Sequence, residues 1–316
     1  MGKHLKHKSF GTIALLAVAI IWGSGFIATE FLIAANWSTS QMMATRFTLA
    51  SLIMLAVIGR KIKESSKKEI ISGSIAGLIL FAAFYSQTFG QSAGASVSFA
   101  AFFTATNVVM VPFISWAING DKPSIKTILI AILALAGVAV LSIEGGSFSL
   151  GLGDLIILLG SFFFALHISF LEKAGGDTDA LRVNFYQITT AAVLSIIVML
   201  FDMQTLPGFD FKKGIWAAIY LGAFSTCLCY MLQTKAQQYV SASYAGVILA
   251  LEGFFGSMFS VILGLEELTM TLVIGGVMII LATVLMSFKS EPGDELDNDE
   301  SEEIEPLIPE QTENDN

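Results

Sequence analysis

The chain has 316 residues, of which 54% are hydrophobic and only 14% are charged, and its mean hydropathy is +0.74. A water-soluble domain does not need this much apolar surface, so the composition excludes a soluble protein and predicts a membrane protein with several spans. Residues 290–316 hold 12 of the 26 carboxylates and no Lys or Arg, which leaves the rest of the chain at 17 − 14 = +3. The formal net charge of −9 therefore describes this tail rather than the membrane part.

Ten apolar spans follow one another, each long enough to cross the hydrocarbon core of a bilayer, which takes about 20 helical residues. The connections between them are short, so no soluble domain fits between two spans. An N-terminal segment, 1–11, precedes the spans, and an acidic tail without aromatic residues, 289–316, which we expect to be disordered, follows them. We expect spans at 12–34, 40–58, 70–89, 97–118, 125–143, 153–172, 182–201, 214–234, 242–264 and 271–288.

The Lys and Arg residues predict the orientation of the chain. With a cytoplasmic N-terminus, 14 of the 17 lie at cytoplasmic ends of spans, and only Lys212 and Lys213 lie outside. The remaining one, Arg46, lies within the second span. Cytoplasmic loops carry an excess of such residues, so both termini are predicted to be cytoplasmic.

The chain contains a repeat with an offset of 145 residues. Segments 96–122 and 241–267 both begin with Ser-x-Ser, continue through an apolar span and have an acidic residue, Asp121 or Glu266, as their last residue but one. The predicted units, 12–148 and 149–288, hold five spans each, and an odd number means that the second unit enters the membrane in the opposite direction. Inverted repeats are typical of secondary transporters, whose sites lie at the repeat interface. We therefore expect an all-α integral membrane protein with ten transmembrane helices in two inverted five-helix repeats.

In the ninth span, Glu252 occupies the position that Asn107 holds in the first unit. A charge at this depth costs roughly 2.5–3.5 kcal/mol or more, so it rarely persists without a use. We expect Glu252 to exchange a proton or bind the substrate. The alternative is a protonated carboxyl group that hydrogen-bonds a neighbouring helix.

Two further ionisable residues lie within spans. His167, in the sixth span, titrates near neutrality and can form a proton relay with Glu252, or can serve as a hydrogen-bonded structural residue. Arg46 can bind a substrate carboxylate, but we expect it to pair with Glu30 near the outer end of the first span. The other two histidines lie in the N-terminal segment, so no metal site is predicted.

Aromatic, hydroxyl and amide side chains complete the candidates. Trp22 and Ser24 belong to a Trp-Gly-Ser-Gly segment in the middle of the first span, where glycines let a helix or a substrate approach the backbone. Helix packing alone is the alternative explanation for these glycines. The side chains that we expect to face a central cavity are Tyr85, Tyr230, Asn107 and Gln187.

Several motifs follow one another in order along the chain. They are Trp22-Gly23-Ser24, Arg46-Phe47, the Pro112 span that ends at Asp121, and the Leu251-Glu252 span that ends in Leu265-Glu266. As an ordered set over about residues 10–288, they resemble the EamA family of the drug/metabolite transporter superfamily. That family usually has Gly-Glu in place of Gly120-Asp121 and Pro in place of Gly253. The resemblance implies ten helices around a central cavity, metabolites or amino acids as substrates that are commonly exported, and a location in the plasma membrane.

These features predict a secondary active transporter, and not an enzyme, that exports a small metabolite or amino acid by alternating access, with protons as the coupling ion. The alternative is a uniporter or exchanger for a nucleotide-linked or phosphorylated metabolite, which would need more cations in the cavity than Arg46 supplies. Remote alternatives are an intramembrane enzyme built on His167 and Glu252, and a non-transporting scaffold that uses the tail. The expected partners are the lipid bilayer, the substrate and protons. We expect no cofactor, metal or nucleic acid, and no feature supports a homodimer.

Overall fold

The computed structural model describes residues 2–95, 97–120, 122–141, 151–176, 178–202, 208, 210–264 and 267–288. The acidic tail and the paired residues Asp121 and Glu266 lie outside these ranges, so the expectations for them stay predictions. Within the described ranges the chain forms helices and no strand.

The helices follow each other with short connections. In the first half they are α1 Gly2–Ala34, α2 Thr39–Ile58, the 3-10 helix η1 Gly59–Glu64, α3 Lys67–Ser92, α4 Val97–Ala105, α5 Asn107–Asn119 and α6 Ile125–Leu141. In the second half they are α7 Leu152–Gly175, α8 Ala180–Asp202, α9 Phe211–Tyr220, the π-helix η2 Leu221–Leu228, α10 Cys229–Ala236, α11 Ala242–Leu249, α12 Leu251–Ile262 and α13 Met270–Ser287.

These elements make ten membrane crossings, because α4 and α5 form one crossing, α9, η2 and α10 another, and α11 and α12 a third. Nine crossings in the described part of the chain are apolar helices of 18 or more residues, and the tenth, over 125–140, is shorter. This confirms the predicted all-helical membrane fold.

Polar side chains cap the N-termini of α2 and α3. Ser38 accepts a hydrogen bond from the Gln41 backbone N–H at 3.2 Å, and the Gln41 side chain accepts one from the Ser38 N–H at 2.8 Å. Ser66 and Glu69 form the same reciprocal pair before α3. Such pairs satisfy backbone donors that have no partner inside the helix.

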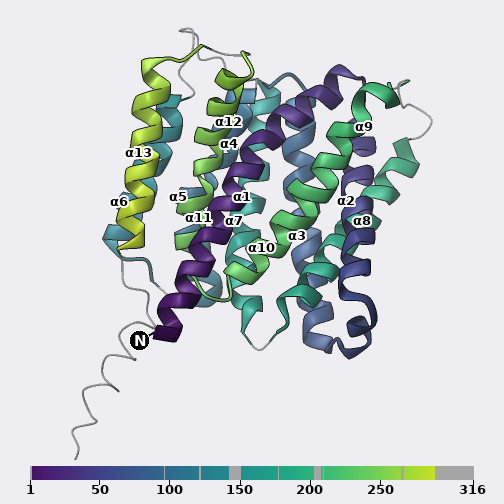
Figure 1. The fold of residues 1–316 in the computed structure, drawn as a ribbon, viewed down its shortest axis with the longest axis horizontal. Helices are drawn as coiled ribbons and strands as arrows, with labels where there is room; N and C mark the ends of the chain where they lie inside the picture. The colour runs from purple at the N-terminus through teal and green to yellow at the C-terminus, as the bar shows by residue number, and fades with distance from the viewer. Residues whose placement is uncertain are drawn as a thin grey trace, which may run out of the picture.

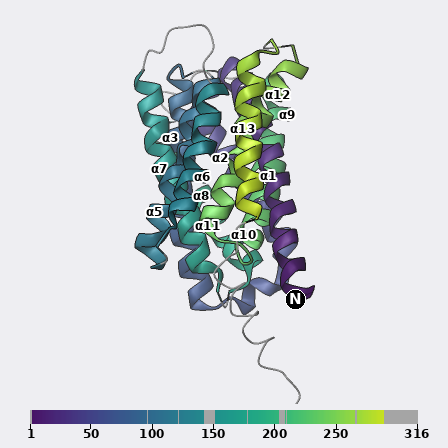
Figure 2. The same cartoon turned by 90° about the vertical axis from the view of Figure 1, so that its left-hand side faces the viewer.

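The two halves interlock rather than lie side by side. Helix α1 packs on α12 and α10, and the corresponding helix α7 of the second half packs on α5 and α3. The pairs α2 with α8 and α6 with α13 join equivalent helices of the two halves. Figures 1 and 2 show the resulting bundle, with α6 and α13 together along one side. This pattern of contacts is that of two inverted repeats related by a pseudo-two-fold axis.

Glycines allow two of these helix pairs to approach closely. A Cβ atom on Gly23 of α1 would lie 2.7 Å from the Gly256 nitrogen and 2.8 Å from the Glu252 carbonyl oxygen of α12. A Cβ atom on Gly77 of α3 would lie 2.3 Å from the Gln187 carbonyl oxygen of α8. Small residues at such crossings are the usual way in which membrane helices pack.

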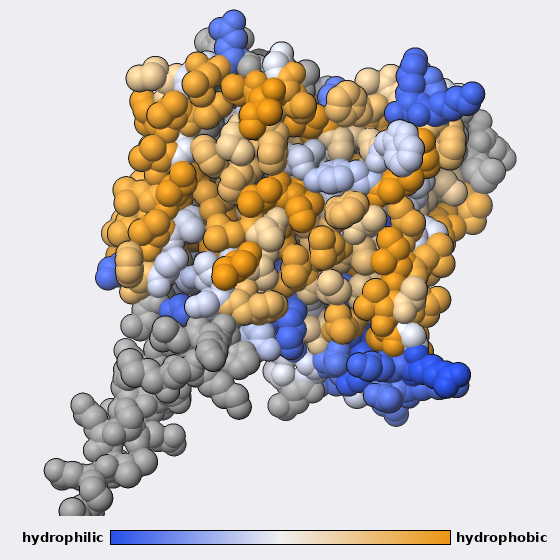
Figure 3. Space-filling view, in the orientation of Figure 1, coloured by the Kyte–Doolittle hydropathy of each residue, from blue (hydrophilic) through white to orange (hydrophobic). Residues whose placement is uncertain are grey.

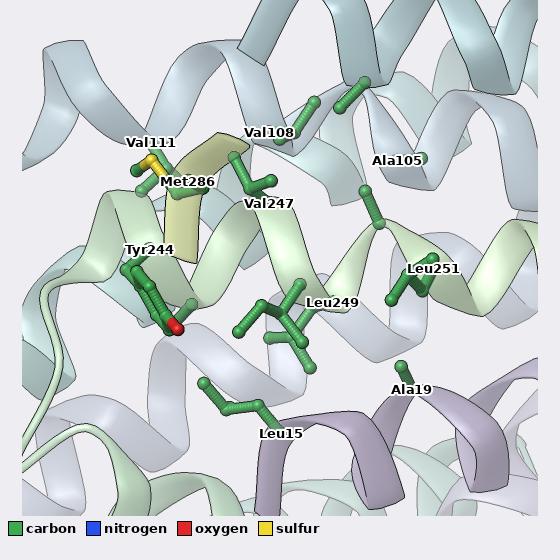
Figure 4. Packing of buried hydrophobic residues seen from close by; sticks show 14 of the residues in the cluster. Leu15, Ala19, Ala105, Val108, Val111, Tyr244, Val247, Leu249, Leu251 and Met286 are labelled. Atoms are coloured by element: carbon green, nitrogen blue, oxygen red, sulfur yellow. The ribbon is translucent and has the colours of Figure 1, made fainter. Parts of the chain in front are cut away.

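The interior and the surface are both apolar. In the largest buried cluster, α11 lies between α1 and α5, with Leu15 near Leu249 and Val111 near Val247 (Figure 4). The outer surface is hydrophobic along the height of the bundle, and hydrophilic residues gather at its two ends (Figure 3). This band is the surface that a bilayer covers.

We call the end of the bundle where α1 begins the near end, and the other one the far end.

Candidate functional site

The crossings that carry Asn107 and Glu252 are interrupted at equivalent places. Thr106 separates α4 from α5, and Ala250 separates α11 from α12, one residue away from the position that the 145-residue offset predicts. Asn107 is the first residue and Glu252 the second residue of the helix that follows each break. Both new helices thus begin inside the bundle, where their first turns carry partial positive charge. Interrupted helices at corresponding positions of two repeats are the best indicator of a transport site.

A π-helix interrupts the eighth crossing. The eight residues of η2 lie between α9 and α10, and π-helical segments are frequent at functional sites. The Trp22 indole nitrogen donates a hydrogen bond to the Ser225 carbonyl oxygen at 2.8 Å. Arg46 Nε donates one to Thr226 Oγ1 at 3.0 Å. The π-helix therefore joins α1 and α2 to the middle of the bundle.

A cavity of about 40 Å³ lies between the two halves. It has room for a few water molecules, since one water needs about 10–15 Å³ on this scale. Residues of α1–α5 line it from the first half, and residues of α7, η2 and α10–α12 line it from the second. Its polar lining includes Arg46, Asn107, His167, Tyr230, Gln233 and Glu252.

Arg46 provides a positive charge at this cavity. The side chain is buried, and besides Thr226 it contacts Ser225 Oγ at 3.5 Å and the ring of Phe84, whose centroid lies 4.2 Å from the guanidinium carbon. No ion pair to Arg46 occurs within the described ranges. A guanidinium group has five N–H donors, so donors remain for a carboxylate in the cavity.

The ion pair that we predicted between Arg46 and Glu30 is not formed among the described residues, and that prediction is wrong. Glu30 is exposed, and its carboxylate accepts a hydrogen bond from Gln91 Nε2 at 3.3 Å. The preceding residue, Thr29, lines the cavity. One residue further, the helix has turned by about 100°, which directs Glu30 away from Arg46.

Some polar groups of the lining have no hydrogen-bond partner in the described part of the chain. Two of them are the buried Tyr230 hydroxyl group and Gln233 Oε1. Glu252, a residue that is 6% exposed, lines the same cavity. A buried polar group left without a partner costs about 1–3 kcal/mol. Two such groups beside the Glu252 carboxyl group are best explained by a ligand or water in the cavity that bonds to them.

Aromatic rings surround Tyr230. Its ring centroid lies 5.2 Å from that of Trp22, 5.6 Å from that of His167 and 5.8 Å from that of Phe84. These distances are typical of favourable aromatic pairs. The rings fix Tyr230 and supply an apolar wall beside the charged groups.

His167 is held by a chain of side-chain hydrogen bonds. Its Nε2 lies 2.9 Å from Gln187 Oε1, and Gln187 Nε2 donates to Asn184 Oδ1 at 2.7 Å and to Thr234 Oγ1 at 2.9 Å. An amide oxygen only accepts, so Nε2 of His167 carries the hydrogen. Gln187 thus does not line the cavity, but it binds His167 and fixes the orientation of the imidazole ring.

The structure brings together six of the nine residues that the sequence suggested. The six that line the cavity are Trp22, Arg46, Asn107, His167, Tyr230 and Glu252. Ser24 lies two residues beyond Trp22, on another side of α1, where its hydroxyl group bonds Tyr220 and the Ile21 carbonyl oxygen. Tyr85 does not line the cavity, and its ring packs on Phe81 and Phe89.

The difference between Tyr85 and its equivalent Tyr230 has a structural cause. Tyr230 follows the π-helix η2, whereas Tyr85 lies in the regular helix α3. A π-helix has more residues per turn than an α-helix, so it rotates the residues after it onto another face. Side chains at equivalent positions of the two repeats therefore point in different directions.

Two amides contribute more to the site than the sequence suggested. Gln233 lines the cavity three residues after Tyr230, which places both on one face of α10. Gln87 also lines it and donates to Thr104 Oγ1 at 2.9 Å, which joins α3 to α4. The three-residue spacing from Tyr230 was the available signal for Gln233.

The fold and this cavity define a class of protein, a polytopic membrane protein with a cavity between two inverted repeats that polar and aromatic residues line. The sequence matches the EamA-like transporter family over residues 9–143 and 151–288, and the chain belongs to that family. It is therefore a membrane transporter.

Relatives of similar length support this assignment. An uncharacterized transporter of Archaeoglobus fulgidus is 28% identical over 282 residues, which cover 89% of this chain and 86% of the relative. The uncharacterized transporter YyaM of Bacillus subtilis is 25% identical over 284 residues, which cover 87% and 92%. A solved crystal structure shares the fold with a TM-score of 0.73 at 15% identity, over 88% of this chain and 96% of that one.

Proposed function

We propose that the protein is a secondary active transporter that exports a small zwitterionic metabolite, such as an amino acid, in exchange for protons. The observation that carries this proposal is the presence of Arg46 and Glu252 in the lining of one cavity, with no ion-pair partner for either in the described ranges. A zwitterion offers one charge to each of them. The surrounding aromatic rings suit the apolar part of such a molecule.

The charge of the lining argues against strongly anionic substrates. Arg46 is the only Lys or Arg among the lining residues that the structure describes. A phosphorylated or nucleotide-linked metabolite carries more negative charge than one guanidinium group can balance. A carboxylate, in contrast, matches the fork of donors on a single arginine.

Polar contacts join neighbouring helices at the near end of the bundle. Arg182 and Glu69 form a two-point ion pair at 2.9 and 3.0 Å, and Asn119 Nδ2 donates to Glu172 at 2.6 Å. Towards the far end, by contrast, the lining of the cavity extends along α1 from Trp22 to Thr29. We assign this arrangement to a state that is sealed at the near end, and the inverted repeats supply the opposite state by exchanging their roles.

The cations support a cytoplasmic near end. It carries the Lys and Arg residues of η1 and of the first turn of α3, whereas the far end carries Lys212 and Lys213. An excess of cations marks the cytoplasmic side. We therefore place both termini in the cytoplasm, and from the membership in the transporter family we propose the plasma membrane as the location.

Coupling rests on Glu252 in this proposal. A proton and the ammonium group of the substrate compete for its carboxylate, so that each displaces the other as the cavity opens to one side and then to the other. This alternation exchanges a proton for a substrate molecule without any further cofactor.

The test uses purified protein in liposomes loaded with labelled amino acids, with and without an imposed pH gradient. The wild type is expected to show selective efflux that an inward proton gradient accelerates. In Glu252→Gln this acceleration is expected to vanish while the protein remains folded, because the amide cannot exchange a proton. Glu30→Gln, which changes an exposed carboxylate of α1, is the control and should behave as the wild type. Proton-driven efflux that persists in Glu252→Gln contradicts the coupling mechanism.

A further inference from the structure

We propose that the protein also binds one anionic phospholipid of the surrounding bilayer in a groove between α1, α9 and α12 at the far end. This site is separate from the central cavity, and the inference does not depend on transport. It rests on the shape of the groove, its depth in the membrane and the two lysines above it.

The groove lies on the surface that the bilayer covers. It has a volume of about 330 Å³, with a floor formed by α1 and walls formed by α9 and α12. In Figure 1 the upper part of α1 passes between α12 and α9. The lining is almost entirely apolar and includes Ile27, Phe31, Ala217, Tyr220, Phe259 and Ile262.

The groove lies below the two lysines, at the depth of lipid acyl chains. Lys213 lies seven residues before Tyr220 on α9, which at about 1.5 Å per residue is about 10 Å along the helix. One leaflet contributes half of a hydrocarbon core roughly 30 Å thick. The groove therefore extends from the membrane interface well into the hydrocarbon of the far-end leaflet, where lipid chains rather than water or a soluble partner cover it.

Lys212 and Lys213 lie at the upper end of this groove. They are the only Lys or Arg residues at the far end of the described chain, in contrast to the many at the near end. Lys213 precedes Ala217 by four residues and Tyr220 by seven, so it lies on the face of α9 that borders the groove. Figure 3 shows hydrophilic surface at the top of α9, with paler surface below it towards α1.

The position of these lysines is unfavourable unless an anion compensates it. Both lie in the first turn of α9, where the partial positive charge of a helix N-terminus repels cations. Asp210 pairs with Lys213 at 3.3 Å, but this pair is exposed, and exposed pairs are weak. No described ion pair involves Lys212. A lipid phosphate placed here would be attracted by both ammonium groups.

Trp216 marks the level of the membrane interface at this site. It lies on α9 between the lysines and the groove residue Ala217, and 76% of its surface is exposed. Tryptophan is enriched where lipid headgroups meet the hydrocarbon. The order along α9 is therefore the one that a phospholipid requires, with cations at the headgroup level, an interfacial aromatic ring and then an apolar groove.

The experiment measures lipid preference with spin-labelled lipids. The protein is reconstituted in phosphatidylcholine with a trace of spin-labelled phosphatidylglycerol or phosphatidylcholine, and the motionally restricted fraction of each is recorded. The wild type is expected to restrict phosphatidylglycerol preferentially, and Lys212→Gln/Lys213→Gln to lose most of that preference, roughly fivefold for each lysine. Lys67→Gln/Lys68→Gln, at the near end, is the matched control and is expected to keep it.

A second variant tests the groove itself. Ala217→Phe fills it without changing charge, and it is expected to reduce the restricted fraction of both lipids while the thermal midpoint stays within a few degrees of the wild type. An unchanged phosphatidylglycerol preference in Lys212→Gln/Lys213→Gln would overturn the proposal. A loss of that preference in the near-end control would also overturn it, because the preference would then follow total charge rather than this site.

Discussion

Tyr230 shows how the site differs from ordinary membrane packing. Its ring is held on three sides by Trp22, His167 and Phe84, yet its buried hydroxyl group has no partner among the described residues. Tyr244, by contrast, is equally buried, and its hydroxyl group lies 2.8 Å from Thr12 Oγ1. A hydroxyl group that serves only the fold is expected to be bonded like that of Tyr244.

Tyr230→Phe is therefore expected to separate binding from stability. Removal of an unpaired buried hydroxyl group should leave the free energy of unfolding unchanged or slightly higher, whereas the apparent affinity for substrate should fall about fivefold with the loss of one hydrogen bond. Thermal unfolding in detergent and the concentration dependence of efflux measure the two effects.

Tyr244→Phe is the matched control for this prediction. It should lower stability by about 1 kcal/mol, because the hydrogen bonds of this hydroxyl group to Thr12 and Ser287 are lost, and should leave substrate affinity unchanged. A stability loss in Tyr230→Phe as large as that in Tyr244→Phe would assign the Tyr230 hydroxyl group to the fold.

At the scale of the elements, the contact between α1 and α12 determines the geometry of the site. Gly23 follows Trp22 on α1, and it approaches the backbone of Glu252 and Gly256 on α12. The close approach of the two helices sets the distance between the Trp22 wall and the Glu252 carboxyl group. A change at this crossing therefore acts on the cavity as well as on stability.

Gly23→Ala is expected to force α1 and α12 apart. The new Cβ atom would lie 2.7–2.8 Å from backbone atoms of α12, which cannot move aside as a side chain can. Overpacking of this kind costs about 1–3 kcal/mol, which should appear as a lower thermal midpoint together with weaker transport.

Gly253→Ala tests the same residue change where there is room. Its Cβ atom would lie 3.5 Å from Val138, an ordinary contact, and alanine favours helix by about 0.5–1 kcal/mol over glycine. This variant should be as stable as the wild type or more so. Equal destabilisation in the two variants would show that backbone contact is not the cause.

At the scale of the whole molecule, the polar contacts are distributed unequally between the two ends. The near end is held by the Glu69–Arg182 pair, in which Glu69 also accepts hydrogen bonds from the Ser66 and Asp179 backbone N–H groups at 2.7 and 2.8 Å. The side chain of Glu69 is 3% exposed and that of Arg182 is 20% exposed. A pair this well buried and bonded opposes the separation of α3 from α8.

Glu69→Gln is expected to make the near end open more readily. The loss of a largely buried ion pair should cost roughly 2 kcal/mol at that end, which corresponds to about thirtyfold faster hydrogen exchange there. Hydrogen–deuterium exchange of the segments around residues 64–70 and 178–184 measures the change, and the far-end segment 35–40 serves as the internal reference. A uniform increase at both ends would show global destabilisation instead of near-end opening.

The sequence alone determined the fold class, because ten apolar spans and an odd five-span repeat leave few arrangements that satisfy the backbone in a membrane. It also identified Glu252 and Arg46, since ionisable residues at membrane depth are rare enough to stand out. Helical periodicity alone did not establish their partners. Arg46 faces η2 rather than Glu30 because of the direction in which each helix turns its side chains.

Only the tertiary structure decided which polar residues share the cavity. The π-helix η2 and the breaks at Thr106 and Ala250 change the face on which later residues lie, and no residue pattern predicted the π-helix. It is for this reason that Tyr230 points into the cavity while the equivalent Tyr85 does not. Composition and periodicity indicate how apolar a helix is and where it crosses the membrane. The direction in which each side chain points depends instead on whether the local backbone hydrogen bonds are those of an α-helix or a π-helix, and on the neighbours against which the helix packs.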